Sequence, residues 1–121
     1  MSYSSTYYVV PFCKISYLEK FTLAEAHFKK ALAINPQSAV LLCHIGLVQH
    51  ALQRHDIALQ TLNQAVTLSP KNPMCLFHRA SMLVANDRLE EALTELEALK
   101  VLTPKESLVY FLIGKVILAS S

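Results

Sequence analysis

Apolar residues recur every three to four positions from about residue 22 to residue 119, which is the spacing of amphipathic helices. The pattern stops and restarts at Pro36, Pro70 and Pro104, which are equally spaced along the chain. A proline biases the residue before it away from helical geometry and so ends a helix. The sequence therefore predicts an all-α chain of short helices whose layout repeats with the spacing of these prolines.

The repeated part is expected to span residues 19–121. It divides into a single helix, two helix pairs and a final single helix, at residues 22–35, 38–70, 72–104 and 106–119. Thr22 and Glu25 form a capping-box pattern at the first helix. Ser38 and Asn72 are expected to cap the first helix of each pair, since their side-chain oxygens can accept from amides of the first turn.

Residues 1–18 break this pattern and are expected to form an irregular N-terminal arm. Pro11 would fall inside a helix, where proline removes a backbone hydrogen bond and costs about 3 kcal/mol. Phe12 would occupy a position that needs a small side chain if two helices are to approach closely.

A 34-residue period with a helix breaker at its end is typical of tetratricopeptide repeat (TPR) arrays, in which helix–turn–helix units stack into a solenoid. We therefore predict a short right-handed TPR superhelix of about three units. Gly46 lies at the position where such a unit needs a small side chain. The last helix, 106–119, is apolar almost all round and no second helix follows it, so we interpret the chain as a piece of a longer array.

Charge and composition narrow the classes of partner. The formal net charge is +2 and no basic run is longer than Lys29 and Lys30, so nucleic acid is not an expected partner. The longest apolar run, 108–119, contains Lys115 and is too short to cross a bilayer, and the N-terminus lacks the features of a signal peptide. We expect no membrane partner, and three cysteines without a secretory signal indicate reduced thiols.

The first helix of each TPR unit lines a concave groove, and steps of three and four residues define one stripe on each of these helices. The candidate groove residues are Cys43, Leu47, His50, Phe77, Ser81, Val84, Phe111 and Lys115, with Val40, Met74, Leu108 and Leu118 on the same stripes. The alternative interpretation is that these side chains pack against neighbouring repeats. Only Lys115 is basic, which argues against the basic clamp of TPR domains that bind chaperone tails.

Two polar residues, Gln49 and Arg79, occupy positions that are usually apolar. A buried arginine needs a carboxylate partner, which Glu91 or Glu95 could supply. We interpret Arg79 as part of a structural ion pair, and the alternative is a contact to a ligand.

Support for a metal or catalytic site is weak. Cys75 and His78 are three residues apart, but zinc requires four converging ligands. A Cys–His nucleophile pair would need an orienting acid, and the chain has no Gly-rich phosphate loop. We therefore expect no metal, no cofactor and no catalytic residues.

Three segments carry a more specific resemblance. They read I-N-P-Q-S-A-V-L-L-C-H-I-G-L-V-Q-H-A-L (34–52), S-P-K-N-P-M-C-L-F-H-R-A-S-M-L (69–83) and T-P-K-E-S-L-V-Y-F-L-I-G-K-V (103–116). These segments closely resemble the C-terminal TPR array in the family of the third subunit of the anaphase-promoting complex, over roughly residues 19–116. C-H-I-G and F-H-R-A make the resemblance specific, because they lie outside the generic TPR positions.

The resemblance implies a non-catalytic scaffold and peptide-binding subunit of a multi-subunit ubiquitin ligase that controls mitotic progression. Its implied partners are the other subunits of that complex and the Ile-Arg tails of activator proteins, in the nucleus and cytoplasm, including the spindle. Residues 1–18 and 117–121 depart from the family, which indicates an alternative or truncated product. A generic TPR adaptor or co-chaperone, and a truncated isoform without independent function, remain as alternatives.

Overall fold

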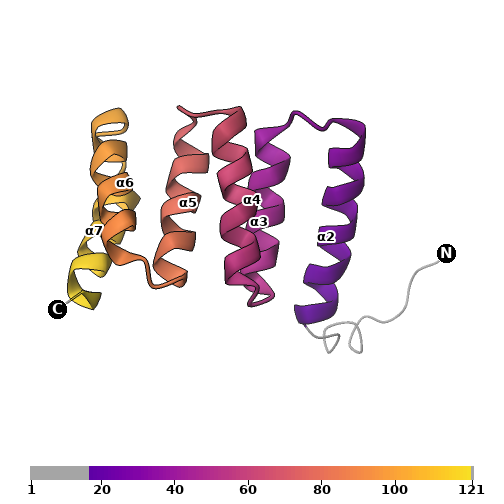
Figure 1. The fold of residues 1–121 in the computed structure, drawn as a ribbon, viewed down its shortest axis with the longest axis horizontal. Coiled ribbons are helices and arrows are strands. Elements are labelled where there is room, and N and C mark those ends of the chain that lie inside the picture. The colour runs from indigo at the N-terminus through magenta and orange to yellow at the C-terminus, as the bar shows by residue number, and fades with distance from the viewer. Residues whose placement is uncertain (1–16, 121) are drawn as a thin grey trace, which may run out of the picture.

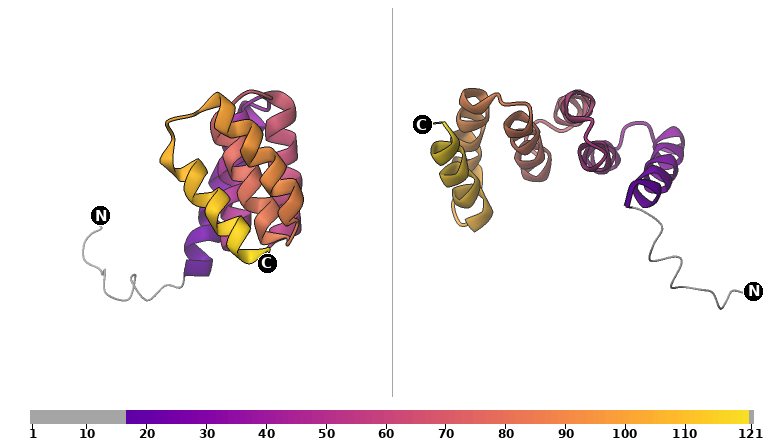
Figure 2. Two further views of the ribbon diagram at one scale, coloured as in Figure 1. Left: turned by 90° about the vertical axis from the view of Figure 1, so that its left-hand side faces the viewer. Right: turned by 90° about the horizontal axis from the view of Figure 1, so that it is seen from below.

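The computed structural model describes residues 17–120, and this part of the chain is helical throughout apart from short connections. The helices are α2 (Tyr17–Ile34), α3 (Ala39–Ala51), α4 (His55–Leu68), α5 (Pro73–Ala85), α6 (Leu89–Leu102) and α7 (Ser107–Ala119). Figure 1 shows the helices standing side by side in chain order, with α2 at one end and α6 and α7 at the other. The view from below in Figure 2 shows that they form a single bent row.

The helix starts are determined by local capping. Ser38 Oγ accepts a hydrogen bond from the Leu41 amide at 3.2 Å, which confirms the predicted cap of α3. Asn72 Oδ1 accepts from the Met74 amide at 2.9 Å, and Pro73 occupies the first helical position, where its missing amide costs nothing. The carboxylate of Glu106 performs the same function for α7.

The turns inside the two complete repeats have the same geometry. Gln53 follows α3 with a φ of 66°, and Asp87 follows α5 with a φ of 60°. After each of these residues the next amide reaches back to close the helix, Arg54 to the Gln49 carbonyl and Arg88 to the Leu83 carbonyl, each at 2.9 Å. This is the Schellman arrangement, in which a left-handed residue satisfies the last carbonyls of a helix.

The predicted capping box at Thr22 and Glu25 is wrong. Helix α2 begins at Tyr17, so both residues lie inside the helix. Thr22 Oγ1 donates to the Leu18 carbonyl at 2.7 Å, and the buried Glu25 carboxylate pairs with Arg54 at the start of α4. Residues 1–16, including the predicted irregularities at Pro11 and Phe12, lie outside the described residues.

Two apolar clusters run through the array and meet inside α5. The first joins α3, α4 and α5 and includes Ala92 of α6, and the second joins α5, α6 and α7, with Leu76 and Val84 packing against both. Gly46 of α3 lies against Leu62 of α4 so closely that a methyl group at Gly46 would overlap Leu62 Cδ2. The predicted small-residue position is therefore one where α3 has no room for a larger side chain against α4.

Among residues 17–120, no helix combines the length and the apolar character that crossing a membrane requires.

Candidate functional site

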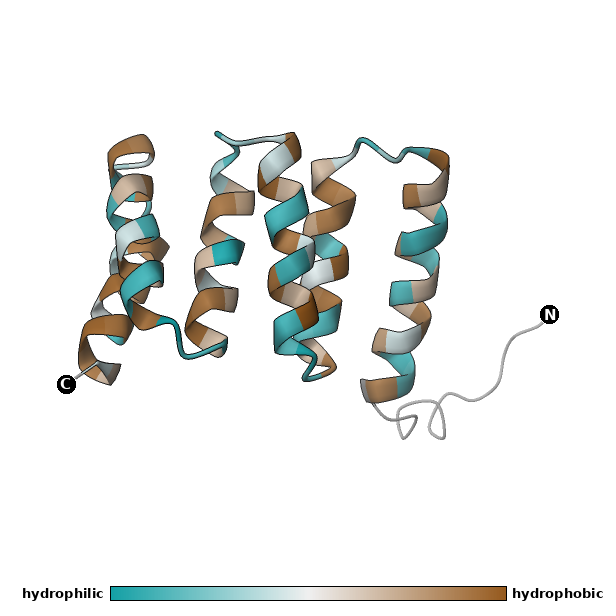
Figure 3. Cartoon of the chain, viewed as in Figure 1, coloured by the Kyte–Doolittle hydropathy of each residue, from teal (hydrophilic) through white to brown (hydrophobic). Residues whose placement is uncertain are grey.

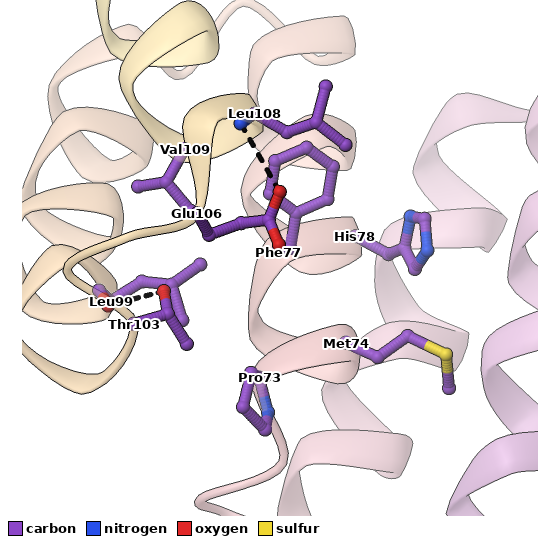
Figure 4. A pocket seen from close by; sticks show the side chains of 9 residues that line it. All are labelled: Pro73, Met74, Phe77, His78, Leu99, Thr103, Glu106, Leu108 and Val109. Atoms are coloured by element: carbon purple, nitrogen blue, oxygen red, sulfur yellow. Dashed lines mark hydrogen bonds between the residues drawn. The ribbon is translucent and has the colours of Figure 1, made fainter.

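A mostly apolar hollow of about 330 Å³ lies where the start of α5 meets the end of α6 and the start of α7 (Figure 4). Its lining residues are Pro73, Met74, Phe77, His78, Leu99, Thr103, Glu106, Leu108 and Val109. The first four residues belong to α5, and Leu108 and Val109 belong to α7, so two first helices contribute to the lining. Proteins bind small side chains and peptides preferentially in concave, apolar sites of this kind.

The polar groups of the hollow are positioned by local hydrogen bonds. Glu106 Oε2 accepts from the Leu108 amide at 3.4 Å, and Thr103 Oγ1 donates to the Leu99 carbonyl at 3.1 Å (Figure 4). Burial, with a smaller contribution from His44, lowers the pKa of His78, so its imidazole is neutral near pH 7. The carboxylate of Glu106 thus places a negative charge beside the apolar lining of the hollow.

This arrangement suits a ligand that has an apolar side chain beside a cationic group. The apolar side chain would contact apolar lining residues such as Phe77 and Leu108. A guanidinium or ammonium group would bind the Glu106 carboxylate by a charge-assisted hydrogen bond. An acidic peptide tail would instead meet a carboxylate of the same charge.

Phe77 is the predicted groove residue that the structure places in the hollow. The stripe neighbours Met74 and Leu108 lie beside it as well. The remaining lining residues were missed by sequence reasoning, because all except His78 come from the ends of helices or from a connection. Glu106 had one detectable signal, its position immediately before an apolar helix, where a capping side chain is common.

The prediction that Cys43 lines an open groove is wrong, because its side chain is 0% exposed. Cys43 belongs to the first apolar cluster together with Cys75 of α5. Burial, and secondarily the neighbouring Cys75, raises the pKa of the Cys43 thiol to about 12. The thiol is therefore neutral and serves as a core residue.

Three further candidates contribute to packing within the chain rather than to the hollow. Leu47 packs against the first cluster, and Val84 packs against both clusters. Ser81 Oγ donates to the Phe77 carbonyl at 3.2 Å, so its hydroxyl is satisfied inside α5. For these positions the packing interpretation describes the structure better than the groove interpretation.

The last three candidates lie away from the hollow. Phe111 is 63% exposed on α7, and Lys115 Nζ lies 5.5 Å from the centre of its ring, within the range of a cation–π contact. His50 lies at the end of α3, with its Nδ1 atom 2.9 Å from Nδ1 of His55. Burial, followed by the charge of His55, lowers the pKa of His50.

The two polar residues predicted in apolar positions both have partners in the second helix of their repeat. Gln49 Oε1 accepts from Thr61 Oγ1 at 2.6 Å, with both side chains buried. Arg79 forms an ion pair with Glu95, at 2.7 Å between Nη2 and Oε1. The structural ion pair predicted for Arg79 is confirmed, and Glu91 instead pairs with Arg88.

Within residues 17–120, no three His, Cys, Asp or Glu side chains converge as a metal site would require.

The helical architecture agrees with comparisons to known proteins. Residues 16–73 and 45–107 match the tetratricopeptide repeat family model. The chain belongs to the tetratricopeptide repeat family, whose domains are in general protein-interaction modules. The all-α TPR solenoid predicted from the sequence is confirmed by this match and by the structures of other TPR domains.

One curated relative is cell division cycle protein 27 homolog B from Arabidopsis thaliana, with 43% identity over 46 residues. That match covers 38% of this chain and 6% of the Arabidopsis protein, so the chain spans only a small part of that relative's length.

Solved structures of other TPR domains have the same fold. The first TPR of Spaghetti (RPAP3), bound to the HSP90 peptide SRMEEVD, superposes with a TM-score of 0.78 at 23% identity, covering 84% of this chain and 82% of that one. The Thermus thermophilus TPR protein TTC0263 gives a TM-score of 0.74 at 28% identity, covering 81% of this chain and 50% of that one.

Proposed function

We propose that this chain is a non-catalytic scaffold and peptide-binding part of a ubiquitin ligase of the anaphase-promoting type. The 43% identity to the Arabidopsis cell division cycle protein 27 homolog B supports this assignment. The observation that carries it is the hollow between α5 and α7, which combines an apolar floor with the carboxylate of Glu106. The proposal includes association with other subunits of that complex and a nuclear and cytoplasmic location, including the spindle.

The ligand we propose is a peptide tail that ends in Ile-Arg. Its isoleucine would contact Phe77 and Leu108, and its guanidinium would bind Glu106, since arginine and carboxylate groups form strong paired hydrogen bonds. A generic TPR adaptor for acidic tails is the competing function, because the RPAP3 domain of similar fold is bound to a peptide ending in EEVD. The negative charge of Glu106 at the edge of the hollow favours binding of the basic tail over the acidic one.

A binding measurement with the full chain separates these two functions. Fluorescence polarisation would compare three labelled peptides that end in Ile-Arg, in Ile-Glu and in EEVD. We expect the Ile-Arg peptide to bind at least about tenfold more tightly than the other two, which corresponds to about 1.4 kcal/mol. Equal binding of the Ile-Arg and Ile-Glu peptides, or tighter binding of EEVD, would contradict the proposal.

A variant that removes the charge of Glu106 but keeps a helix cap tests the role of this residue. Glu106→Ser removes the charge but keeps an oxygen that can cap α7, since serine is a favoured residue at this position. We expect weaker Ile-Arg binding with unchanged helix content. Glu90→Gln is the matched control, because it removes one negative charge at the opposite end of α6, about 20 Å away. Equal weakening by both variants would point to net charge rather than to the hollow.

The alternative of a truncated product without independent function makes a separate prediction, that the isolated chain does not fold cooperatively. A sharp thermal transition in far-ultraviolet circular dichroism would exclude it. Purification of the tagged chain with defined subunits of the anaphase-promoting complex would then test the scaffold role directly.

A further inference from the structure

The connection between α6 and α7, residues 103–106, supplies the negative charge of the hollow. Thr103 and Glu106 both belong to this connection, and both line the hollow. Helix α7 itself is mostly apolar, and Figure 3 shows hydrophobic colours along most of its visible length. The place of the Glu106 carboxylate therefore depends on the conformation of this short connection.

Two kinds of hydrogen bond hold this connection in place. At its ends the backbone bonds to itself, since the Thr103 amide donates to the Leu99 carbonyl at 2.9 Å and the Glu106 amide donates to the Thr103 carbonyl at 3.1 Å. In its middle a side chain takes part, because the Tyr110 hydroxyl donates to the Pro104 carbonyl at 2.8 Å. This distance is typical of a well-formed hydrogen bond from a hydroxyl to an oxygen. Tyr110 therefore links the first turn of α7 to the middle of the connection.

The tyrosine and the charged cap occur together in one repeat. One and two periods earlier, in α5 and α3, leucine takes the place of Tyr110, and its side chain cannot donate a hydrogen bond. Those two helices are capped by the uncharged Asn72 and Ser38, which take the place of Glu106. Among these three helices, the hydroxyl that holds the connection is thus found where the cap is a carboxylate.

We propose that Tyr110 is a positioning residue for ligand binding, whose hydroxyl holds the connection in the conformation that presents the Glu106 carboxylate at the hollow. Tyr110 is not one of the residues that line the hollow, so it acts through Glu106 and not by contact with the ligand. A connection that is ordered before the ligand arrives does not have to be ordered on binding, which increases the affinity. This inference rests on the proposed function for the identity of the ligand, a peptide tail with a cationic end.

Nuclear magnetic resonance relaxation of the full chain tests this positioning without a ligand. Tyr110→Phe removes the hydroxyl and keeps the aromatic ring. At Lys105 and Glu106 we expect backbone order parameters of about 0.85 in the natural chain, typical of a rigid backbone, and of about 0.6 in this variant. Lys71, in the equivalent connection before α5, should keep its order parameter. Unchanged order at Lys105 and Glu106 in the variant would overturn the proposal.

A double-mutant cycle shows whether Tyr110 acts through Glu106. Fluorescence polarisation would measure binding of the Ile-Arg peptide to the natural chain, to Tyr110→Phe, to Glu106→Ser and to the double variant. We expect Tyr110→Phe to weaken binding about fivefold in the natural chain, but less than about twofold in the Glu106→Ser background, because no carboxylate remains there to be positioned. Equal weakening in both backgrounds would mean that Tyr110 has only a general structural role, and no weakening in either would also refute the proposal.

Thr94→Val is the matched control for the loss of a hydroxyl. The Thr94 hydroxyl donates to the Glu90 carbonyl within α6 at 3.0 Å, and Thr94 does not line the hollow. We expect this variant to bind the peptide as the natural chain does, and circular dichroism verifies that all variants are folded. If the natural chain binds no Ile-Arg peptide, the proposed ligand is wrong, and the order of the connection still decides whether Tyr110 positions Glu106.

Discussion

Arg79 of α5 and Glu95 of α6 form a two-point ion pair across the second complete repeat. Arg79 Nη2 lies 2.7 Å from Glu95 Oε1, and Arg79 Nε lies 2.7 Å from Oε2. Only 13% of the Glu95 side chain is exposed. The corresponding positions one period away from Arg79 are Ile45 and Ile113, so the other repeats place an apolar residue where this one places a charge.

The Arg79→Ile variant should therefore be destabilised, although isoleucine is the residue that the other repeats use. Removal of the arginine leaves the carboxylate of Glu95 largely buried without its partner, which costs about 3–5 kcal/mol. Urea denaturation followed by circular dichroism measures the loss. The double variant Arg79→Ile with Glu95→Leu should recover to within about 1 kcal/mol of the natural chain, since an apolar pair can replace an ion pair. Equal instability of the single and double variants would show that packing at Arg79, and not charge, matters.

The two glycines should respond in opposite ways to the same substitution. Gly46→Ala should destabilise the chain by about 1–2 kcal/mol, because the new methyl group overlaps the fully buried Leu62. Gly114→Ala should stabilise it by up to about 1 kcal/mol, because alanine is the better helix former and the site is open. Thermal denaturation of both variants provides the comparison, and a loss of stability at Gly114 would mean that the face of α7 is not open.

Stability should fall as the pH is lowered from about 7 to about 5. The pKa values of His50 and His78 are lowered, in both cases mainly by burial, so the unfolded chain binds protons that the folded chain does not. Their contribution to stability is complete above the ordinary histidine pKa of about 6.5 and is lost as the pH falls below it. Urea midpoints at several pH values measure the slope. The double variant His50→Gln with His78→Gln should have a flatter profile, and an unchanged profile would assign the slope to other groups.

The thiols of Cys43 and Cys75 should resist alkylation in the folded chain. Burial is the main cause that raises the pKa of both thiols, and both side chains are 0% exposed, so little thiolate is available. Mass spectrometry after treatment with N-ethylmaleimide at pH 8 would locate the modified residues. Both should be protected in buffer and modified in guanidinium chloride, which serves as the control. Rapid modification of Cys43 in buffer would show that α3 opens readily.

The ends of most helices were predictable, because their causes are local. Pro36, Pro70 and Pro104 interrupt the apolar pattern at equal intervals, and α2, α4 and α6 each end close before one of them. Ser38 and Asn72 cap the helices that follow, as their residue types and positions indicated. Thr22 and Glu25 also have the residue types of a helix cap, but both lie inside α2. There the carboxylate of Glu25 accepts a hydrogen bond from Arg54, which is distant in the sequence.

The sequence by itself determined the class of fold and its period, since hydrophobic spacing and backbone restriction act over a few residues. The tertiary structure decided which residues of each stripe face solvent. Helical spacing placed Cys43 and Phe77 at equivalent points, but the packing of neighbouring helices buries Cys43 in the core and leaves Phe77 beside a hollow. Glu106 becomes part of that hollow only because α6 returns the chain to the start of α5. Whether a side chain is buried depends on neighbours that are distant in the sequence, so a local sequence pattern cannot predict it.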